Sequence, residues 1–113
     1  MTTATIIDVT EATFEASVIE ASRTTAVMVD FWADWCPPCR ALTPVLERVA
    51  AEYAGRVVLA KVDADENMKL AGRYKLRGFP TVILFVKGEA VDQFSSARPP
   101  DFVRNFLDRH LDV

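Results

Sequence analysis

The sequence predicts an α/β fold in which an open, mixed β-sheet has helices on both faces. Apolar, strand-like segments alternate with segments that repeat their apolar residues at helical spacing, and there is no internal repeat. Two strand-like segments near the end are joined by Lys87-Gly88-Glu89, which indicates one antiparallel hairpin among parallel crossovers. The 113 residues, half of them hydrophobic, are enough for one compact core, so we expect residues 1–113 to form a single domain.

The first half of the chain is predicted to contain two strands and two helices. A short apolar strand at residues 6–9 is followed by Thr10, whose hydroxyl is suited to cap the next helix. Residues 26–32 are nearly all apolar, as expected for a strand that is covered on both faces. Apolar residues then recur at i, i+3, i+4 and i+7, which predicts a helix from the cysteines to just before Gly55.

The second half is predicted to add three strands and two helices. A buried strand at residues 57–62 precedes a short helix whose apolar residues lie between 68 and 74. The hairpin strands at 81–86 and 90–94 come next, and a final helix opens after two consecutive prolines, which suit the first helical turn. The whole chain therefore predicts a central sheet of about five strands flanked by four helices.

Charge and hydropathy argue against several classes of partner. Thirteen Lys and Arg oppose sixteen Asp and Glu, so the net charge is -3, and no basic run is present to follow a nucleic-acid backbone. No stretch approaches about 18 consecutive apolar residues, and the first residues lack the basic start and apolar segment of a secretory signal. We expect a cytoplasmic protein that binds neither nucleic acid nor membranes.

Both cysteines, Cys36 and Cys39, lie in one Cys-x-x-Cys motif at the predicted start of a helix. Free N–H groups and the helix dipole favour a thiolate there, which makes the first cysteine nucleophilic. The alternatives are a pair of inert thiols, or half of a metal or cluster site shared between two chains. A tetrahedral site needs four ligands, and His110, the only histidine, reads more simply as a solvated residue of the last helical turn. No metal site within one chain is expected.

Asp30 is a carboxylate in the middle of the apolar strand at 26–32. Burial of an ionised carboxylate is costly and raises its pKa, which makes the group a candidate proton acceptor near neutral pH. Lys61, in the 57–62 strand, is placed to lie alongside Asp30 and to tune its pKa. Two alternatives remain at this point: Asp30 at a solvated edge of the sheet, and Lys61 extending to the surface.

A third signal is the segment Arg77-Gly78-Phe79-Pro80-Thr81, in which proline directly precedes an apolar strand. The Trp-Cys-x-Pro-Cys motif, the Asp six residues before its first cysteine and the Pro-Thr pair about forty residues later occur together at the spacing of one family. The chain resembles thioredoxin over nearly its whole length, in the segments VDFWADWCPPCRALTPVLERVAAEYAGRV, AKVDADEN and YKLRGFPTVILFVKGE. This resemblance implies the thioredoxin fold and a protein-disulfide reductase.

The resemblance also implies a division of roles at the cysteines. Cys36 would attack a disulfide of a target protein, and Cys39 would resolve the mixed disulfide. Asp30, with Lys61 and a water, would accept the proton of Cys39. Electrons are implied to come from NADPH through a separate thioredoxin reductase, so no bound cofactor is expected, and no GxGxxG motif is present. The implied partners are that reductase and disulfide-containing target proteins, and this chain is implied to be a monomer.

A substrate-binding surface around the cysteines follows from the same resemblance. Pro80 would form a cis peptide bond facing the cysteines, and the Phe79 backbone would pair with an extended target strand. Trp35 would shield the sulfurs, with Trp32 packed beneath it. The residues expected to bind substrate are Trp35, Pro37, Pro38, Phe79, Pro80 and Thr81.

Two positions depart from the family pattern, because Pro37 replaces a glycine in the motif and Ser96 replaces a glycine after the last strand. Pro37 and Pro38 both lack an N–H, which leaves chiefly the N–H groups of Cys39 and Arg40 to stabilise the Cys36 thiolate. Reduction potential and substrate choice are therefore the properties that the resemblance defines least. A dithiol oxidase or isomerase, and a redox-independent docking module that uses the same surface, remain as alternatives.

Overall fold

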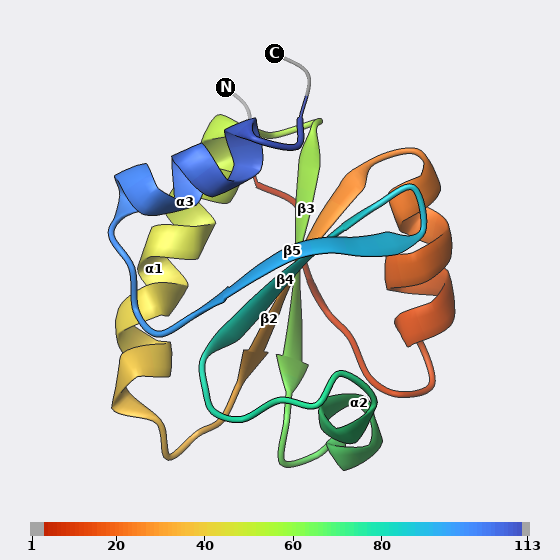
Figure 1. The fold of residues 1–113 in the computed structure, drawn as a ribbon, viewed down its shortest axis with the longest axis vertical. Coiled ribbons are helices and arrows are strands. Elements are labelled where there is room, and N and C mark those ends of the chain that lie inside the picture. The colour runs from red at the N-terminus through yellow and green to blue at the C-terminus, as the bar shows by residue number, and fades with distance from the viewer. Residues whose placement is uncertain (1–3, 112–113) are drawn as a thin grey trace.

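A computed structural model describes residues 4–111 and contains a five-stranded mixed sheet flanked by helices (Figure 1). The strands and helices are β1 (Ile6–Asp8), η1 (Glu15–Glu20), η2 (Ala21–Arg23), β2 (Ala26–Trp32), α1 (Pro37–Glu52), β3 (Val57–Asp63), α2 (Met68–Arg73), β4 (Thr81–Val86), β5 (Glu89–Ser95) and α3 (Pro100–Asp108). The strand order is β1-β3-β2-β4-β5; β3 is parallel to β1 and β2, whereas β4 is antiparallel to β2 and β5. The predicted fold class is confirmed. No helix among the described residues is long and apolar enough to cross a bilayer.

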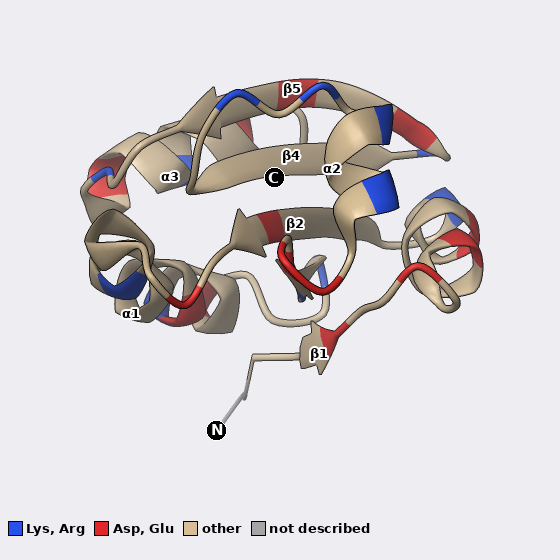
Figure 2. Cartoon of the chain, turned by 90° about the horizontal axis from the view of Figure 1, so that it is seen from below, with Lys and Arg blue, Asp and Glu red and all other residues tan. Residues whose placement is uncertain are grey.

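Both faces of the sheet are covered, with α1 and α3 on one side and η1 on the other (Figure 2). Successive residues of β4 show the division, because side chains of a strand point alternately to opposite faces. Val82 and Leu84 join the core cluster beneath α1 and α3, whereas Ile83 and Phe85 join the cluster beneath η1 and α2. From Ala26 to Phe31, β2 is buried throughout, as expected for the centre of the sheet.

Two expectations about helix ends are wrong. The Thr10 hydroxyl does not cap the following helix; instead the Thr10 backbone N–H donates to Thr13 Oγ1 (3.0 Å), and the π-helical segment η1 starts without a side-chain cap. His110 is not free in solvent, because its Nε2 lies 2.8 Å from Asp92 Oδ2 and its side chain is partly buried. In both cases, a partner side chain that sequence periodicity cannot locate determines the contact.

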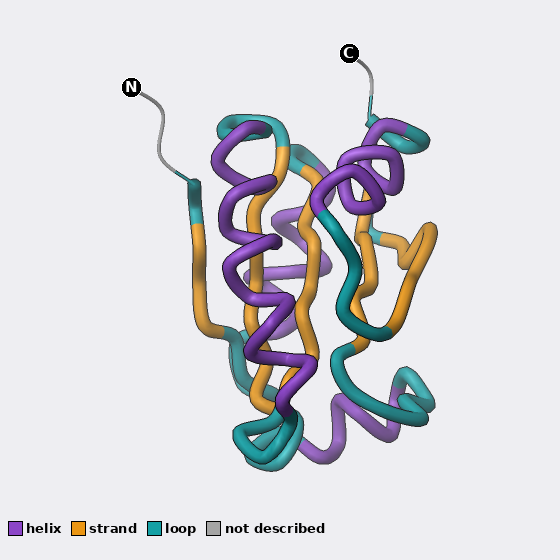
Figure 3. Tube along the Cα trace, turned by 90° about the vertical axis from the view of Figure 1, so that its left-hand side faces the viewer, coloured by secondary structure: helices purple, strands orange, loops and turns teal. Residues whose placement is uncertain are grey.

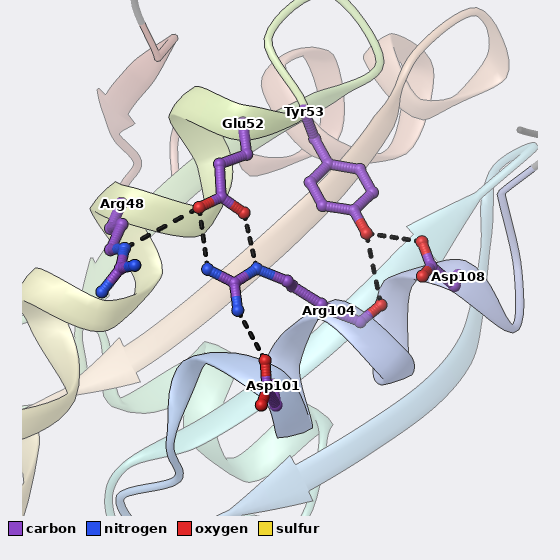
Figure 4. Close-up of polar contacts among 6 residues, drawn as sticks. All are labelled: Arg48, Glu52, Tyr53, Asp101, Arg104 and Asp108. Carbon is purple, nitrogen blue, oxygen red and sulfur yellow. Dashed lines mark hydrogen bonds and ion pairs between the residues drawn. The ribbon is translucent and has the colours of Figure 1, made fainter.

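The long helix α1 carries the cysteine motif at its N-terminus and runs along the strands (Figure 3). Its C-terminal end is held against α3 by polar contacts (Figure 4). Arg104 donates to both carboxylate oxygens of Glu52 (2.6 and 2.8 Å) and to Asp101 (2.6 Å), while the Tyr53 hydroxyl donates to Asp108. These contacts fix the end of α1 that lies farthest from the cysteines, so the motif is presented by an anchored helix.

Candidate functional site

The cysteines lie just beyond the C-terminal end of β2, where Cys36 is the N-cap residue of α1. Ligand sites in open α/β sheets favour this edge, beyond the carboxyl ends of the strands. Cys36 and Cys39 form a disulfide with a Cα–Cα distance of 5.3 Å. Both residues are nearly buried, at 2% and 3% exposure. The structure is therefore that of the oxidised protein.

One backbone donor reaches the first sulfur. The Cys39 N–H lies 3.2 Å from Cys36 Sγ and 3.1 Å from the Cys36 carbonyl oxygen. The Arg40 N–H was expected to help stabilise the Cys36 thiolate, but it donates to the Cys36 carbonyl oxygen instead (3.4 Å). The Arg40 guanidinium is exposed and donates to the Asp34 carbonyl (3.0 Å). Pro37 and Pro38 occupy the exposed first turn of α1 and have no N–H to offer.

Asp30 is buried in β2 at 2% exposure, so it does not lie at a solvated edge. Burial raises its pKa from 3.8 to about 7, against a smaller lowering effect of Lys61. Parallel pairing of β2 with β3 places Asp30 opposite Lys61 in register. Asp30 Oδ1 has no hydrogen-bond partner among residues 4–111. A pKa of about 7 suits a group that takes up and releases a proton near neutral pH.

A cavity of about 320 Å³ adjoins Cys39 on the side of Lys61. Lys61 is only partly buried, and its Nζ lies 5.7 Å from the centre of the Trp32 ring, which also lines the cavity. The Trp32 indole N–H is buried and has no partner among the described residues. Trp32 packs against the cluster formed by Ala33 and the two cysteines. The side of Cys39 therefore faces polar groups and open space rather than a closed apolar core.

The loop before β4 lies against the other side of the disulfide. The Phe79–Pro80 peptide bond is cis, and the Phe79 carbonyl oxygen lies 3.4 Å from Cys36 Sγ. Pro80 is buried, and its carbonyl accepts a hydrogen bond from the Ser96 N–H (3.1 Å). Thr81 is 4% exposed and its hydroxyl donates to the Gly78 carbonyl (2.7 Å). The Thr81 side chain thus braces the loop and is turned away from the surface that a target would meet.

Trp35 forms the exposed rim of the site, with 63% of its surface accessible. Its ring meets that of Phe79 edge to face at 6.1 Å between centroids, and its indole N–H donates to Asp65 Oδ2 (2.9 Å). Asp65 was not among the expected site residues. Its position in the segment AKVDADEN was the signal available, but only the fold shows that this loop reaches Trp35.

The structure therefore gathers the expected site residues at one end of the sheet. They are Asp30 and Lys61 on neighbouring strands, Trp35 through Cys39 at the start of α1, and Phe79 to Thr81 at the start of β4. Within residues 4–111, no three His, Cys, Asp or Glu side chains are grouped as a metal ion would require.

Comparison with known proteins agrees with this geometry. The thioredoxin family model matches residues 5–109. Thioredoxin 1 of Synechococcus elongatus is 44% identical over 103 residues, covering 91% of this chain and 94% of the relative. Thioredoxin C-2 of Corynebacterium nephridii is 42% identical over 108 residues, with 96% and 98% coverage. Thioredoxin of Chlorobaculum thiosulfatiphilum is 38% identical over 104 residues, with 92% and 94% coverage. The chain belongs to the thioredoxin family.

Proposed function

We propose that this single-domain chain is a protein-disulfide reductase, a thiol-disulfide oxidoreductase whose dithiol form reduces disulfides in target proteins. The observation that carries the proposal is the Cys36–Cys39 disulfide at the start of α1, in a chain of the thioredoxin family. A dithiol at this position has a helix N-terminus to stabilise one thiolate and a second sulfur close enough to close the ring.

The reaction moves two electrons from the dithiol to the target. The Cys36 thiolate attacks one sulfur of the target disulfide, so the target S–S bond breaks and its other sulfur leaves as a thiolate that takes up a proton. Cys39 then loses its proton and attacks Cys36 Sγ. The mixed disulfide breaks, the second target thiol is released, and the Cys36–Cys39 disulfide remains as in the structure.

Asp30 is proposed as the proton acceptor for Cys39. Its pKa of about 7 makes the carboxylate available near neutral pH without making it too weak a base. Lys61 is a positioning residue, because its backbone is paired in register with Asp30 and its charge lowers the pKa of that carboxyl. The cavity between Cys39 and Lys61 gives room for a water to carry the proton.

The proposed target-binding surface consists of Trp35, the exposed Pro37 and Pro38, and the Phe79–Pro80 loop. An extended target segment would pair with the Phe79 backbone in the manner of an added strand. Thr81 would contribute by holding this loop through its hydrogen bond to Gly78.

The electron source is proposed to be NADPH, acting through a separate thioredoxin reductase, so that this chain itself binds no cofactor. We propose a monomer that works in the cytoplasm on disulfide-containing target proteins. The use of cysteine is in keeping with a reducing compartment, because both cysteines of the chain are in the redox pair and none forms a structural cross-link.

Substitution of each cysteine by serine tests this function. With dithiothreitol as the electron donor, Cys36→Ser should abolish the reduction of insulin disulfides, because the attacking nucleophile is lost. Cys39→Ser should also lose turnover but should trap targets as mixed disulfides, since attack proceeds and resolution does not. Trapping by the Cys36 variant in place of the Cys39 variant would reverse the assigned roles. Absence of insulin reduction by the native protein would instead indicate a redox-independent docking module.

A further inference from the structure

A polar groove of about 510 Å³ runs beside the Phe79–Pro80 loop, on the side away from Trp35. Its walls are residues 75–81 together with Gln93, Ser95 and Ser96. The charged side chains among them are Lys75 and Arg77, and no carboxylate lines the groove. A cationic groove is notable in a chain whose net charge is -3.

Neither cation of the groove is neutralised within the described part of the chain. Lys75 and Arg77 are exposed, and neither forms an ion pair with any residue between 4 and 111. The backbone that carries Lys75 is fixed, because its N–H donates to the Gly72 carbonyl (3.1 Å) and the next N–H donates to the Ala71 carbonyl (3.1 Å). The positive charge of the two side chains is therefore not neutralised by the described residues and is available to a bound partner.

The rim on the opposite side of the disulfide carries exposed carboxylates, which the groove lacks. Figure 2 shows acidic residues along the loops after β2 and β3 and basic residues on α2 and beyond it. Trp35 is bonded to Asp65, and Asp34 and Glu66 are exposed in the same two loops. Exposed carboxylates therefore lie on the Trp35 side of the disulfide, together with the Arg40 guanidinium that bonds to the Asp34 carbonyl, whereas none lines the groove.

We propose that the groove selects target proteins whose segment next to the attacked disulfide carries Asp or Glu. This inference rests on the proposed reductase function and adds a substrate class to it. A strand paired with the Phe79 backbone runs past the groove, so acidic side chains on it meet Lys75 and Arg77. Gln93, Ser95 and Ser96 supply uncharged hydrogen-bonding groups around the two cations. Exposed charges of this kind act mainly on the rate of encounter, and salt weakens them.

Three synthetic disulfide peptides of equal length test the proposal, with two Glu residues before the attacked cysteine, two Glu residues after it, or Gln at all four positions. The measured quantity is the second-order rate constant for reduction by the dithiol form at low ionic strength. The test variant is Lys75→Gln with Arg77→Gln. The control is Lys87→Gln with Arg56→Gln, at the opposite end of β4 and β3, which removes the same charge. Lys87 also matches Lys75 in exposure and in backbone φ, at 55° and 54°.

The native protein should reduce at least one acidic peptide about two- to tenfold faster than the Gln peptide. The groove variant should lose this preference, the control variant should keep it, and added salt should remove it from the native protein. Equal losses in the two variants would overturn the inference, since overall charge would then be the cause. Absence of any preference, with the Gln peptide still reduced, would also overturn it while leaving the reductase function intact. Failure to reduce any peptide would overturn both.

Discussion

Replacement of Asp30 by Asn should make the oxidised protein increasingly more stable than the native form as the pH rises. Burial raises the pKa of Asp30 from 3.8 to about 7, and Lys61 lowers it to a smaller extent. A carboxyl whose pKa is higher in the folded than in the unfolded state favours folding while it is protonated. That contribution is complete below about pH 4 and is lost as the pH rises through about 7. Asn lacks this titration.

The size of the effect follows from the shift. A difference of about three pKa units at about 1.4 kcal/mol per unit corresponds to about 4 kcal/mol. The buried amide of Asn has its own hydrogen-bonding cost, which does not change with pH. The difference in unfolding free energy between Asp30→Asn and the native protein should therefore grow by about 4 kcal/mol between pH 4 and pH 8, whatever its value at pH 4.

Urea unfolding of both oxidised proteins at intervals between pH 4 and pH 8 measures this difference. Asp34→Asn removes a carboxylate from an exposed position near the site and serves as the control. In the dithiol form, Asp30→Asn should also slow the resolving step near neutral pH, as seen in single-turnover reduction of a target disulfide. A stability difference that stays flat across the pH range would show that Asp30 is not the buried, proton-binding group inferred here, and its proposed role would be lost.

Three further substitutions give distinct outcomes. Pro37→Gly should make the protein no more reducing than the native form. The reason is that the native Pro37 turn is stiffer and has fewer donors to the thiolate, and both effects favour the disulfide. A more negative reduction potential of the variant in glutathione equilibration would contradict this. Ser96→Gly should raise the unfolding free energy by up to about 1 kcal/mol in urea titration, because Ser96 has φ 74° and glycine adopts that region without strain. Arg104→Gln should lower Tm at pH 7. That loss should fade in acid, because the hydrogen bond from Arg104 lowers the pKa of Glu52, and protonation of Glu52 removes the contribution as the pH falls. A Tm loss that is unchanged at low pH would exclude the ion pair as its cause.

The sequence was sufficient for the sheet, and it placed Asp30 and Lys61 on neighbouring strands while leaving the burial of both side chains open. The apolar run of β2 and the alternation of helices and strands indicate which segments are buried. The structure has both the buried strand and this order of elements. Asp30 and Lys61 occupy consecutive buried strands of a parallel crossover, so their proximity follows from the topology once the two strands pair directly.

Contacts that depend on the meeting of two loops were beyond the sequence. The bond from Trp35 to Asp65 joins residues thirty positions apart through loops whose paths periodicity does not specify. Periodicity does not specify the contact between His110 and Asp92 either, because it joins strand β5 to the turn after α3. The Arg40 N–H is a subtler case. The acceptor of the Arg40 N–H depends on where α1 begins. Because α1 begins at Pro37, this N–H donates to the Cys36 carbonyl oxygen.

The placement of charges around the cysteines also could not be predicted from the sequence, and it bears on function. A net charge of -3 and the absence of a basic run argue against a nucleic-acid partner, but they average over a surface on which charges are sorted by the fold. Lys75 and Arg77 are only two cations, separated by one residue, and gain their significance from lining a groove beside the disulfide that no carboxylate lines. A reductase needs only a brief encounter with each target, so a modest electrostatic bias at the reacting sulfur is enough to rank substrates. Selectivity of this kind resides in the arrangement of charges around Cys36, and total charge carries no information about it.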